Sequence, residues 1–458
     1  MPDFDAVIIG TGQAGPSLAI RLAKAGMKVA IIERKFMGGT CINTGCTPTK
    51  TLVASAYAAH IARRAAEYGV SIQGNIGVDM KRVKARKDAI VEQWRAGLRA
   101  SLSETKNCTF YEGHARLVSE REVSIGEKRF TTERIFINTG GRSSAPPIPG
   151  LEAVPYLTNS SMLDVDFVPQ HLLILGGSYI GLEFGQIYRR FGAKVTIIEM
   201  APRLIAREDE EISATIKDIL KAEGIDIHLN ARCLSVAKKP EGVTLRLNSE
   251  AGPLEIEGSH LLLAAGRRPN TDDLGLEAAG VLQDARGYIT VDDELRTNVP
   301  GIWALGDCNG KGAFTHTSYN DFEVVAANIL DGDPRKWTDR IEAYALYTDP
   351  PLGRAGMSEV QARRTGRRIL VGQRPMTRVA RAVEKGESQG LMKILVDGDS
   401  KEILGAAILG PGGDEAIHCI LDVMYTKVPY TVLQRAMHIH PTVSELIPTI
   451  LGELQPLH

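Results

Sequence analysis

The sequence has no excess of charge of either sign. Its 54 lysine and arginine residues are balanced by 55 aspartate and glutamate residues, which leaves a formal net charge of −1 at pH 7. Nucleic acids and anionic membranes attract proteins through an excess of positive charge, so we expect neither as a partner. Local basic runs such as 81–87 are most simply solvated helix faces.

Long apolar runs are also missing. No stretch of 18 apolar residues is present to cross a bilayer, and no basic segment with an apolar one behind it precedes the strand predicted at 5–9. The sequence therefore predicts a cytoplasmic protein without a membrane partner. Its 458 residues are too many for one core and predict about two to four domains, while a hydrophobic content of 43% is ordinary for a globular chain.

Cysteine is scarce, with six residues in the whole chain. So few cysteines do not form a disulfide scaffold, and in a reducing cytosol a close pair indicates redox chemistry or a metal site. Cys41 and Cys46 are the close pair. The others have no thiol nearby in sequence and are expected to be buried as small hydrophobic residues: Cys108, Cys233, Cys308 and Cys419.

The close pair lies in a glycine-rich segment, 38–50, before an apolar run from Leu52 that predicts a helix. On a regular helix, residues five apart have Cα atoms about 8–9 Å apart, whereas a disulfide needs about 7 Å or less. Pairing would require a bent backbone, for which Gly45 and Pro48 supply the means. A disulfide at a helix start is easily reduced, because the helix N-terminus favours a thiolate. Taken alone, the spacing leaves open two unrelated thiols in a loop.

A glycine-rich turn follows the first predicted strand directly. It has the pattern Gly-x-Gly-x-x-Gly, formed by Gly10, Gly12 and Gly15, and leads into a helix predicted to reach Gly26. The next strand ends on Glu33, 23 positions after Gly10. The glycines allow a pyrophosphate to approach the backbone at a helix N-terminus, and the acid accepts hydrogen bonds from a ribose. The pattern in this context predicts a dinucleotide site.

The same strand, turn, helix and strand recur later in the chain. Here the turn contains Gly176, Ser178 and Gly181, and the acid is Glu199, again 23 positions after the first glycine. Ser178 replaces the middle glycine, so it either donates its hydroxyl to the phosphate or weakens the site. Glu199 favours NADH because a carboxylate repels a 2′-phosphate, although Arg203 lies close enough to blur that preference. We expect a second dinucleotide site.

These features together resemble the pyridine nucleotide–disulfide oxidoreductases, the family of dihydrolipoamide dehydrogenase, glutathione reductase and mercuric reductase. The resemblance covers the whole chain. Besides the two turns and Gly-Gly-Thr-Cys-x4-Cys-x-Pro-x-Lys, it rests on Thr139-Gly140 with Pro149-Gly150, Gly266 through Asn270, Thr297 through Asp307, and His440-Pro-Thr-x2-Ser-Glu445.

The resemblance implies the fold class. We expect an α/β protein with two Rossmann-like domains, for FAD and NAD, and a C-terminal α+β dimerisation domain that makes a homodimer. The expected boundaries are 1–149 for the first FAD-binding segment, 150–263 for the NAD(P)H-binding domain, 264–335 for the second FAD-binding segment and 336–458 for the interface domain. Apolar patterns predict strands at 28–32, 171–175, 194–198, 391–396 and 403–409, and a helix near 415–426.

The resemblance also implies which residues hold each cofactor. For FAD they are Gly10, Gly12, Gly15, Glu33, Gly39, Thr40, Lys50, Ala115, Thr139, Gly140, Gly306 and Asp307. For NAD(P)H, with NADH favoured, they are Gly176, Ser178, Tyr179, Gly181, Glu199 and Gly266. Of these, Tyr179 is either a gate over the nicotinamide pocket or a packing residue, and Asp307 matches the aspartate that binds the ribityl chain.

By the same resemblance, NADH reduces the flavin on one face, and the flavin reduces a Cys41–Cys46 disulfide on the other. Cys46 is expected to be the thiolate against the flavin ring, and Cys41 the thiol that meets the substrate. Lys50, paired with Glu183, matches the lysine beside the flavin. The alternatives are a surface lysine and a solvated helix glutamate.

A thiolate that attacks a substrate needs a proton donor and acceptor near pH 7, which is the range of histidine. The resemblance implies that His440 supplies it across the dimer interface and that Glu445 orients the ring. His438 and His440 form a His-x-His pair, the alternative being half of a metal site. No third ligand has a fitting spacing, so we expect no metal.

The substrate is the least determined expectation. The chain ends without the cysteine pair of mercuric reductases, and Glu199 disfavours glutathione reductase. Segments such as 48–52, 136–140 and 350–357 are similar to the mercuric-reductase-like flavoproteins of the reactive-chlorine response. That implies reduction of a small oxidised substrate, such as hypothiocyanous acid, or of Cu(II) or Hg(II).

Two alternatives are dihydrolipoamide dehydrogenase and a flavin-dependent redox sensor or scaffold. Two residues have no settled role. Arg354 either steers an anionic substrate or forms a structural ion pair, and we assign nothing to His316.

Overall fold

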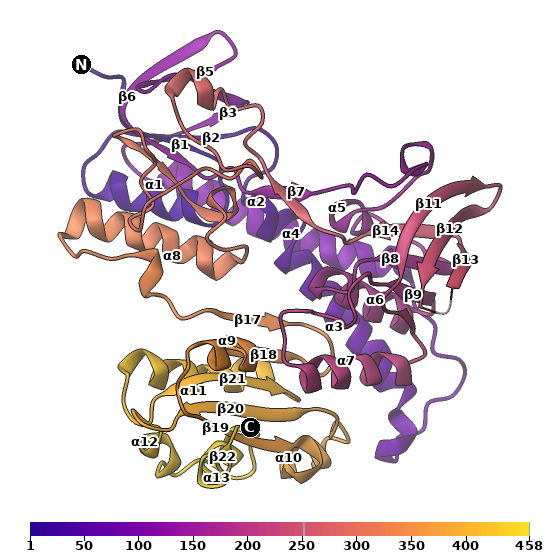
Figure 1. Ribbon diagram of the computed structural model, residues 1–458. Helices are drawn as coiled ribbons and strands as arrows, with labels where there is room; N and C mark the ends of the chain where they lie inside the picture. Colours follow the sequence, from indigo (N-terminus) through magenta and orange to yellow (C-terminus); the bar gives the residue numbers. More distant parts are fainter. Residues whose placement is uncertain (251, 458) are drawn as a thin grey trace.

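The computed structural model describes residues 1–250 and 252–457. Figure 1 shows three bodies: two sheet domains side by side and a C-terminal domain beneath them. This α/β architecture, with two nucleotide-binding folds and an α+β domain, confirms the expected fold class. The residue boundaries of the domains stay a prediction. Within the described ranges, no helix is both long and apolar enough to cross a membrane.

The first domain is built on a seven-stranded sheet. In spatial order its strands are β3 (Cys108–Glu112), β2 (Val29–Glu33), β1 (Phe4–Ile9), β6 (Lys128–Ile137), β5 (Glu122–Ile125) and β4 (Ala115–Ser119), with β16 (Ile302–Ala304) paired to β6. Ala6 and Ile8 of β1 pack against helices α1 (Ala14–Lys24) and α8 (Thr315–Ala326), while Val7 and Ile9 face the opposite layer. A strand that is covered on both faces has apolar residues at every position, so the sequence alone indicates the strand β1 clearly.

The second domain repeats the plan on a smaller scale. Its parallel sheet contains β10 (Asp226–His228), β9 (Lys194–Ile198), β8 (His171–Leu175) and β14 (His260–Leu263), in that order. Helix α6 (Tyr179–Phe191) covers one face and α7 (Glu210–Ala222) follows β9. The other face packs on an antiparallel sheet of β11 (Arg232–Lys239), β12 (Gly242–Ser249) and β13 (Gly252–Gly258). In both domains a glycine-rich turn follows the first parallel strand, β1 in the first domain and β8 in the second.

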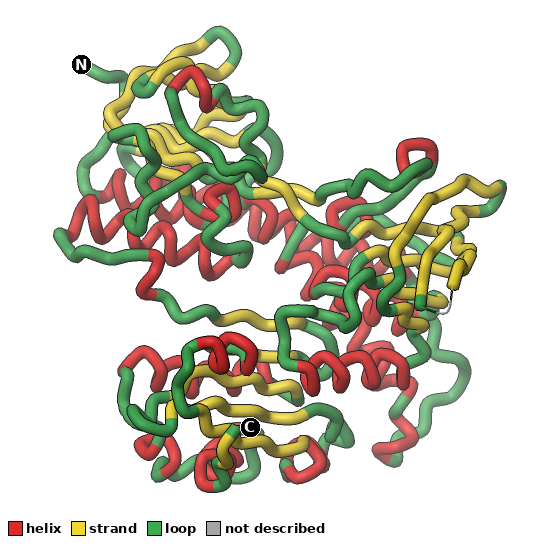
Figure 2. Tube along the Cα trace, in the orientation of Figure 1, coloured by secondary structure: helices red, strands yellow, loops and turns green. Residues whose placement is uncertain are grey.

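The C-terminal domain has an antiparallel sheet with helices around it, as Figure 2 shows. The strands, in order, are β17 (Ala343–Leu346), β18 (Leu352–Gly356), β21 (Ile403–Leu409), β20 (Leu391–Asp397), β19 (Ile369–Pro375) and β22 (Gln455–Pro456). The helices are α9 (Glu359–Arg364), α10 (Ala380–Glu384), α11 (Gly413–Thr426), α12 (Thr431–Gln434) and α13 (Ile447–Gly452). A large apolar cluster of strand and helix side chains fills most of this domain, and a smaller one lies between the sheet and α9.

Three connecting helices position the cysteine pair. They are α2 (Gly39–Asn43), α3 (Cys46–Arg63) and the long α4 (Met80–Glu104). Helix α3 begins at Cys46, earlier than the apolar run from Leu52 indicated, because polar residues fill its first turn. Two short strands, β7 (Gly141–Ser143) and β15 (Arg267–Pro269), pair where the chain crosses between the sheet domains. The first turn of α3 therefore faces a junction of all three bodies.

Candidate active site

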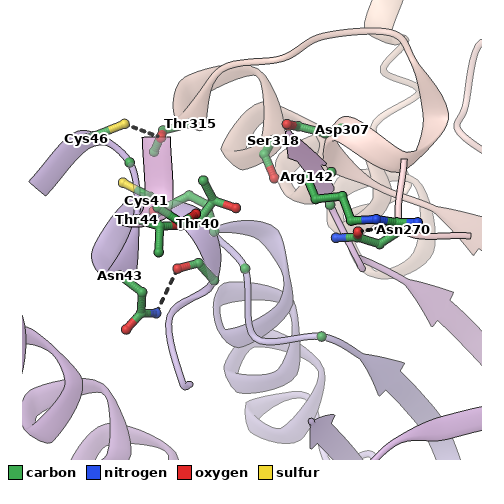
Figure 3. A pocket seen from close by; sticks show the side chains of 18 of the residues that line it. Thr40, Cys41, Asn43, Thr44, Cys46, Arg142, Asn270, Asp307, Thr315 and Ser318 are labelled. Atoms are coloured by element: carbon green, nitrogen blue, oxygen red, sulfur yellow. Dashed lines mark hydrogen bonds between the residues drawn. The ribbon is translucent and has the colours of Figure 1, made fainter. Parts of the chain in front are cut away.

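One cavity of about 1210 Å³ runs through this junction. Its lining begins at Gly10 and Gly12, passes Cys41 and Cys46, and reaches Tyr347 of the C-terminal domain. The volume exceeds the range of about 300–1,000 Å³ that is usual for small-molecule pockets. Figure 3 shows the cysteine end and the Asp307 end of the same cavity. A long ligand fits this shape better than a compact one.

The first glycine-rich turn has no room for side chains. A Cβ atom at Gly10, where φ is +107°, would lie 2.3 Å from the carbonyl oxygen of Asn138, and one at Gly15 would lie 2.2 Å from the oxygen of Gly10. Gly39 has a φ of +60°, and a Cβ there would lie 2.6 Å from the Cα atom of Gly12. Only glycine, which has no side chain, allows the segment that leads to Cys41 to approach the first glycine-rich turn this closely.

The two acids that follow the glycine-rich turns hold those turns in the same way. Glu33 Oε2 accepts hydrogen bonds from the backbone N–H of Thr11, at 3.0 Å, and from its hydroxyl, at 2.8 Å. Glu199 Oε2 accepts from the Gly177 N–H at 2.6 Å, and its Oε1 accepts from the Ala201 N–H at 2.7 Å. The shared geometry places both carboxylates at the carboxyl edges of β2 and β9, where a ribose binds in such folds.

Unpaired polar atoms line the first part of the cavity. Asn138 Nδ2 and Thr139 Oγ1 are buried without a hydrogen-bond partner within the described chain, and both residues line the cavity. Asp307 also lines it, with Arg267 Nη2 3.6 Å from its carboxylate, and burial raises the pKa of Asp307. Buried donors of this kind need acceptors from a ligand. Together with the glycine turn, these groups fit FAD.

The residues expected at FAD line the same cavity except Gly15, which packs against Gly10 within the first turn, and Gly306. Thr40, Lys50, Ala115 and Gly140 line it. Gly306 does not, but a Cβ there would lie 2.8 Å from Ser318 Oγ, so the turn after β16 is also closely packed.

The second glycine-rich turn accepts its serine without backbone strain. Ser178 has φ −103° and ψ −177°, an extended conformation open to any residue, and its hydroxyl makes no capping bond to α6. By contrast, a Cβ at Gly181 would lie 2.0 Å from the oxygen of Gly176. Tyr179 and Glu183 line the large cavity, whereas the following residues of the second site lie outside its lining: Gly176, Ser178, Gly181, Glu199 and Gly266.

Cys41 and Cys46 lie on different helices, with Gly45 at the break between them. The backbone at Gly45 has φ −135° and ψ −118°, so α2 and α3 do not form one helix and the expected bend is present. Both cysteines are free thiols in this structure, and both line the same cavity. The neighbouring Cys41 thiol lowers the pKa of Cys46 to about 6, while Cys46 and burial raise the pKa of Cys41. This direction favours Cys46 as the thiolate and Cys41 as the thiol, the roles that the family resemblance implies, and these roles stay a prediction.

Lys50 lies one helical turn after Cys46 and is held by two groups. Its Nζ is 2.7 Å from Glu183 Oε2 and 4.4 Å from the centre of the Tyr347 ring. The buried Glu183 also accepts the Tyr347 backbone N–H at 3.0 Å. The ammonium contributes to the lowered pKa of Cys46. The ion pair therefore brings a fixed positive charge to the cavity, and Glu183 is not a solvated helix residue.

Thr315 is a site residue that the sequence did not indicate. It is the first residue of α8, and its Oγ1 lies 3.1 Å from Cys46 Sγ, as the dashed line in Figure 3 shows. Its hydroxyl also lowers the pKa of Cys46. The neighbouring His316 lines the cavity, and its ring Nε2 is 2.7 Å from the carbonyl oxygen of Ala343. A threonine 269 positions from a cysteine carries no local sequence signal.

His440 and Glu445 form a pair at the surface of the C-terminal domain. His440 Nδ1 lies 2.9 Å from Glu445 Oε2, and the His440 side chain is 74% exposed. Met437 and Ile439 beside it are 98% and 78% exposed, an apolar surface of the kind that a second subunit covers. His438 Nδ1 instead contacts the Ser444 carbonyl oxygen at 2.7 Å. In the described chain no three potential ligands gather to hold a metal ion.

Arg354 lies in an ion-pair cluster rather than at the cavity. Its Nη1 is 3.1 Å from Asp209 Oδ2 and 3.5 Å from Glu208 Oε2, and its side chain is 3% exposed. Asp209 also lies 3.3 Å from the buried Lys393. The position supports the structural ion pair over the steering of a substrate.

Comparison with known proteins gives one consistent result. A family model described as pyridine nucleotide-disulphide oxidoreductase matches residues 4–322, and one described as the dimerisation domain of these oxidoreductases matches residues 343–450. The chain is 37% identical over 453 residues to RclA of Escherichia coli strain K12, a probable pyridine nucleotide-disulfide oxidoreductase, covering 97% of this chain and 98% of that protein.

It is also 34% identical over 466 residues to a dihydrolipoyl dehydrogenase of Chlamydia muridarum, with 99% of this chain and 98% of that one covered. A solved structure of the Cu(II) complex of the HOCl-induced flavoprotein disulfide reductase RclA from Escherichia coli superposes with a TM-score of 0.88. The two sequences are 36% identical, and the match covers 98% of this chain and 99% of that one.

Proposed function

The chain belongs to the pyridine nucleotide–disulphide oxidoreductase family, whose members use FAD with NAD(P)H as electron donor, and we propose that it transfers electrons from NADH to a small oxidised substrate through Cys41 and Cys46. The chain is an enzyme of this family. The observation that carries the more specific proposal is the dithiol itself. Two neighbouring free thiols, one with its pKa lowered to about 6, line a cavity that fits FAD.

FAD bound in this cavity would supply the two-electron chemistry that links hydride from NADH to reduction of the sulfur pair. Cys46 then holds negative charge, because Cys41, Thr315 and Lys50 all favour its thiolate. Cys41 keeps its proton and is the thiol that meets the substrate. Glu183 fixes the Lys50 ammonium so that this charge stays within the cavity. The chain's own residues thus separate the two sulfurs into a stored thiolate and a reacting thiol.

We assign the proton transfer to His440 of a second copy. Its ring is oriented by Glu445, and an exposed imidazole beside an apolar surface suits a group that enters a neighbouring subunit's site. The match to a dimerisation-domain model supports a homodimer with a site shared across the interface. A balanced net charge of −1 supports a partner set without nucleic acid or membrane. We place the enzyme in the cytoplasm.

The donor we favour is NADH. The Glu199 carboxylate stands where a 2′-phosphate would bring a second negative charge, and Arg203 donates to the Ala206 carbonyl oxygen at 3.1 Å rather than facing Glu199.

For the substrate we propose an oxidised sulfur species such as hypothiocyanous acid, or a metal ion such as Cu(II) or Hg(II). The similarity to the HOCl-induced RclA, which also has a Cu(II) complex, favours these over lipoamide. Dihydrolipoamide dehydrogenase is the second candidate, because the His440–Glu445 pair suits it and a relative carries that name.

Steady-state turnover of purified holoenzyme tests the proposal. With NADH, the rate should be high with hypothiocyanous acid or Cu(II) and low with lipoamide and glutathione disulfide. Cys41→Ser should abolish turnover while FAD stays bound, and Cys233→Ser, a thiol on β11 far from the cavity lining, should leave it unchanged. Turnover that survives Cys41→Ser would refute the proposal. Lipoamide as the best substrate would favour the second candidate, and no turnover at all would favour a redox sensor.

A further inference from the structure

Three aromatic rings, each from a different body of the molecule, come together next to the start of α8. Phe314, just before α8, has its ring centre 5.8 Å from that of Tyr179 at the start of α6. It also stacks on Tyr344 of β17, with centres 5.6 Å apart and planes 6° apart. The ring of His316 lies nearly parallel to Phe314 as well, at 5.4 Å and 9°. Offset, near-parallel rings at this spacing attract one another.

The stack is fixed at both of its outer members. His316 Nε2 contacts the carbonyl oxygen of Ala343, the residue before Tyr344. The Tyr344 hydroxyl donates to Glu208, whose carboxylate is buried beside Arg354. Phe314 therefore packs against two rings that are each tied to rigid structure. Its own freedom to move is correspondingly small.

Thr315 follows Phe314 directly in the chain. Its hydroxyl lies 3.1 Å from Cys46 Sγ, the contact that the dashed line in Figure 3 marks. A hydrogen bond across a cavity holds only while the backbone that carries it keeps its place. The ring of Phe314, one residue earlier, joins that backbone to Tyr344 of the C-terminal domain.

From this geometry we propose that Phe314 is a positioning residue for the redox pair: its stack with Tyr344 and His316 holds the start of α8 so that Thr315 stays hydrogen-bonded to Cys46. The inference rests on the proposed function, since it concerns the same thiolate. Phe314 has no polar group with which to hydrogen-bond either sulfur. It acts through Thr315.

The test is a pH titration of the Cys46 thiolate in holoenzyme that carries Cys41→Ser. In that background the sulfur cannot form a disulfide with Cys41, and its thiolate beside oxidised flavin gives a long-wavelength absorption band. Thr315→Val should raise the midpoint pH of this band by about one to two units, the equivalent of a hydrogen bond to a charged group. Phe314→Leu should raise it by at least about half a unit. The double variant should match Thr315→Val alone.

Two further variants separate positioning from simple packing. Phe314→Tyr keeps a stacking ring and should keep the original midpoint. Phe167→Leu removes a ring that packs on His260 in the second domain, 5.1 Å between centres, and should change nothing. If Phe314→Leu does not retain flavin, Phe314→Met takes its place in the same comparison.

The outcomes separate a failure of the positioning role of Phe314 from a failure of the proposed function. An unchanged midpoint in Phe314→Leu, or shifts that add in the double variant, would overturn the inference while leaving the proposed function intact. If the parent protein shows no thiolate band at any pH, the proposed function itself fails.

Discussion

Replacing Arg354 by methionine tests whether this arginine is structural. The guanidinium is 3% exposed and is the cation nearest to Glu208, whose side chain is 0% exposed, and it shares Asp209 with Lys393. Arg354→Met leaves Glu208 buried without a countercharge. Removing one partner of a buried ion pair costs about 3–5 kcal/mol. We expect a loss of stability of that size.

The corresponding shift in melting temperature follows from the length of the chain. An unfolding entropy of about 2.1 cal/mol/K per residue gives about 1 kcal/mol/K for 458 residues, so the midpoint should fall by about 3–5 °C if the chain unfolds as one unit. Thermal release of flavin, followed by its fluorescence, measures this in the holoenzyme. Burial already raises the pKa of Glu208. A carboxyl group whose pKa is higher in the folded than in the unfolded protein contributes most to stability when it is protonated, and that contribution is lost as the pH rises. The loss of stability in Arg354→Met should therefore be smaller at pH 5 than at pH 8.

A matched control is available in the same domain. Arg363 pairs with Glu359 on the surface of α9, with 43% of its side chain exposed, and Arg363→Met should cost less than about 1 kcal/mol. A structural role of Arg354 is refuted if the melting temperature of Arg354→Met equals that of this control variant. It is also refuted if the variant instead loses kcat/KM for an anionic substrate in a salt-dependent way, since that is the signature of steering.

Three other substitutions test the site. Gly39→Ala should yield protein that does not retain FAD, measured by its absorption after gel filtration, because the new methyl group would lie 2.6 Å from the Cα atom of Gly12; a yellow variant would contradict this. Glu199→Ala should lower kcat/KM for NADH about 10- to 100-fold and reduce the ratio of kcat/KM for NADH to that for NADPH. An unchanged ratio would show that Glu199 does not determine the preference for NADH. His440→Gln should slow steady-state turnover about 10²- to 10⁴-fold while stopped-flow reduction by NADH stays fast; equal loss in both would remove His440 from the proton transfer.

Local patterns predicted the frame of the molecule well. The strands at 171–175, 194–198 and 403–409 have the predicted bounds, because buried parallel and central strands are continuous apolar runs between glycine turns. The start of α3 was placed late, since its first turn carries Cys46 and other polar residues that give no apolar period. Helix ends depend on caps and breaks, here Gly45, more than on periodicity.

Contacts between distant segments were beyond any local pattern. Thr315 meets Cys46 across 269 positions, and Arg354 meets Asp209 across 145. The Lys50–Glu183 pair, 133 positions apart, was expected only through the family resemblance. Such pairs are fixed by how the three bodies pack together, which single-sequence reasoning does not contain. The roles assigned to these residues stay predictions.

Anaerobic titration of the oxidised holoenzyme with NADH tests the central claim most directly. We expect the protein to take up four electrons per FAD, two for the flavin and two for the sulfur pair. The long-wavelength absorption of the thiolate–flavin pair should increase as the first two electrons enter. The band should fade as the pH falls through about 6, the value to which the neighbouring Cys41 thiol lowers the pKa of Cys46. Uptake of only two electrons, with no such band at any pH, would contradict the account.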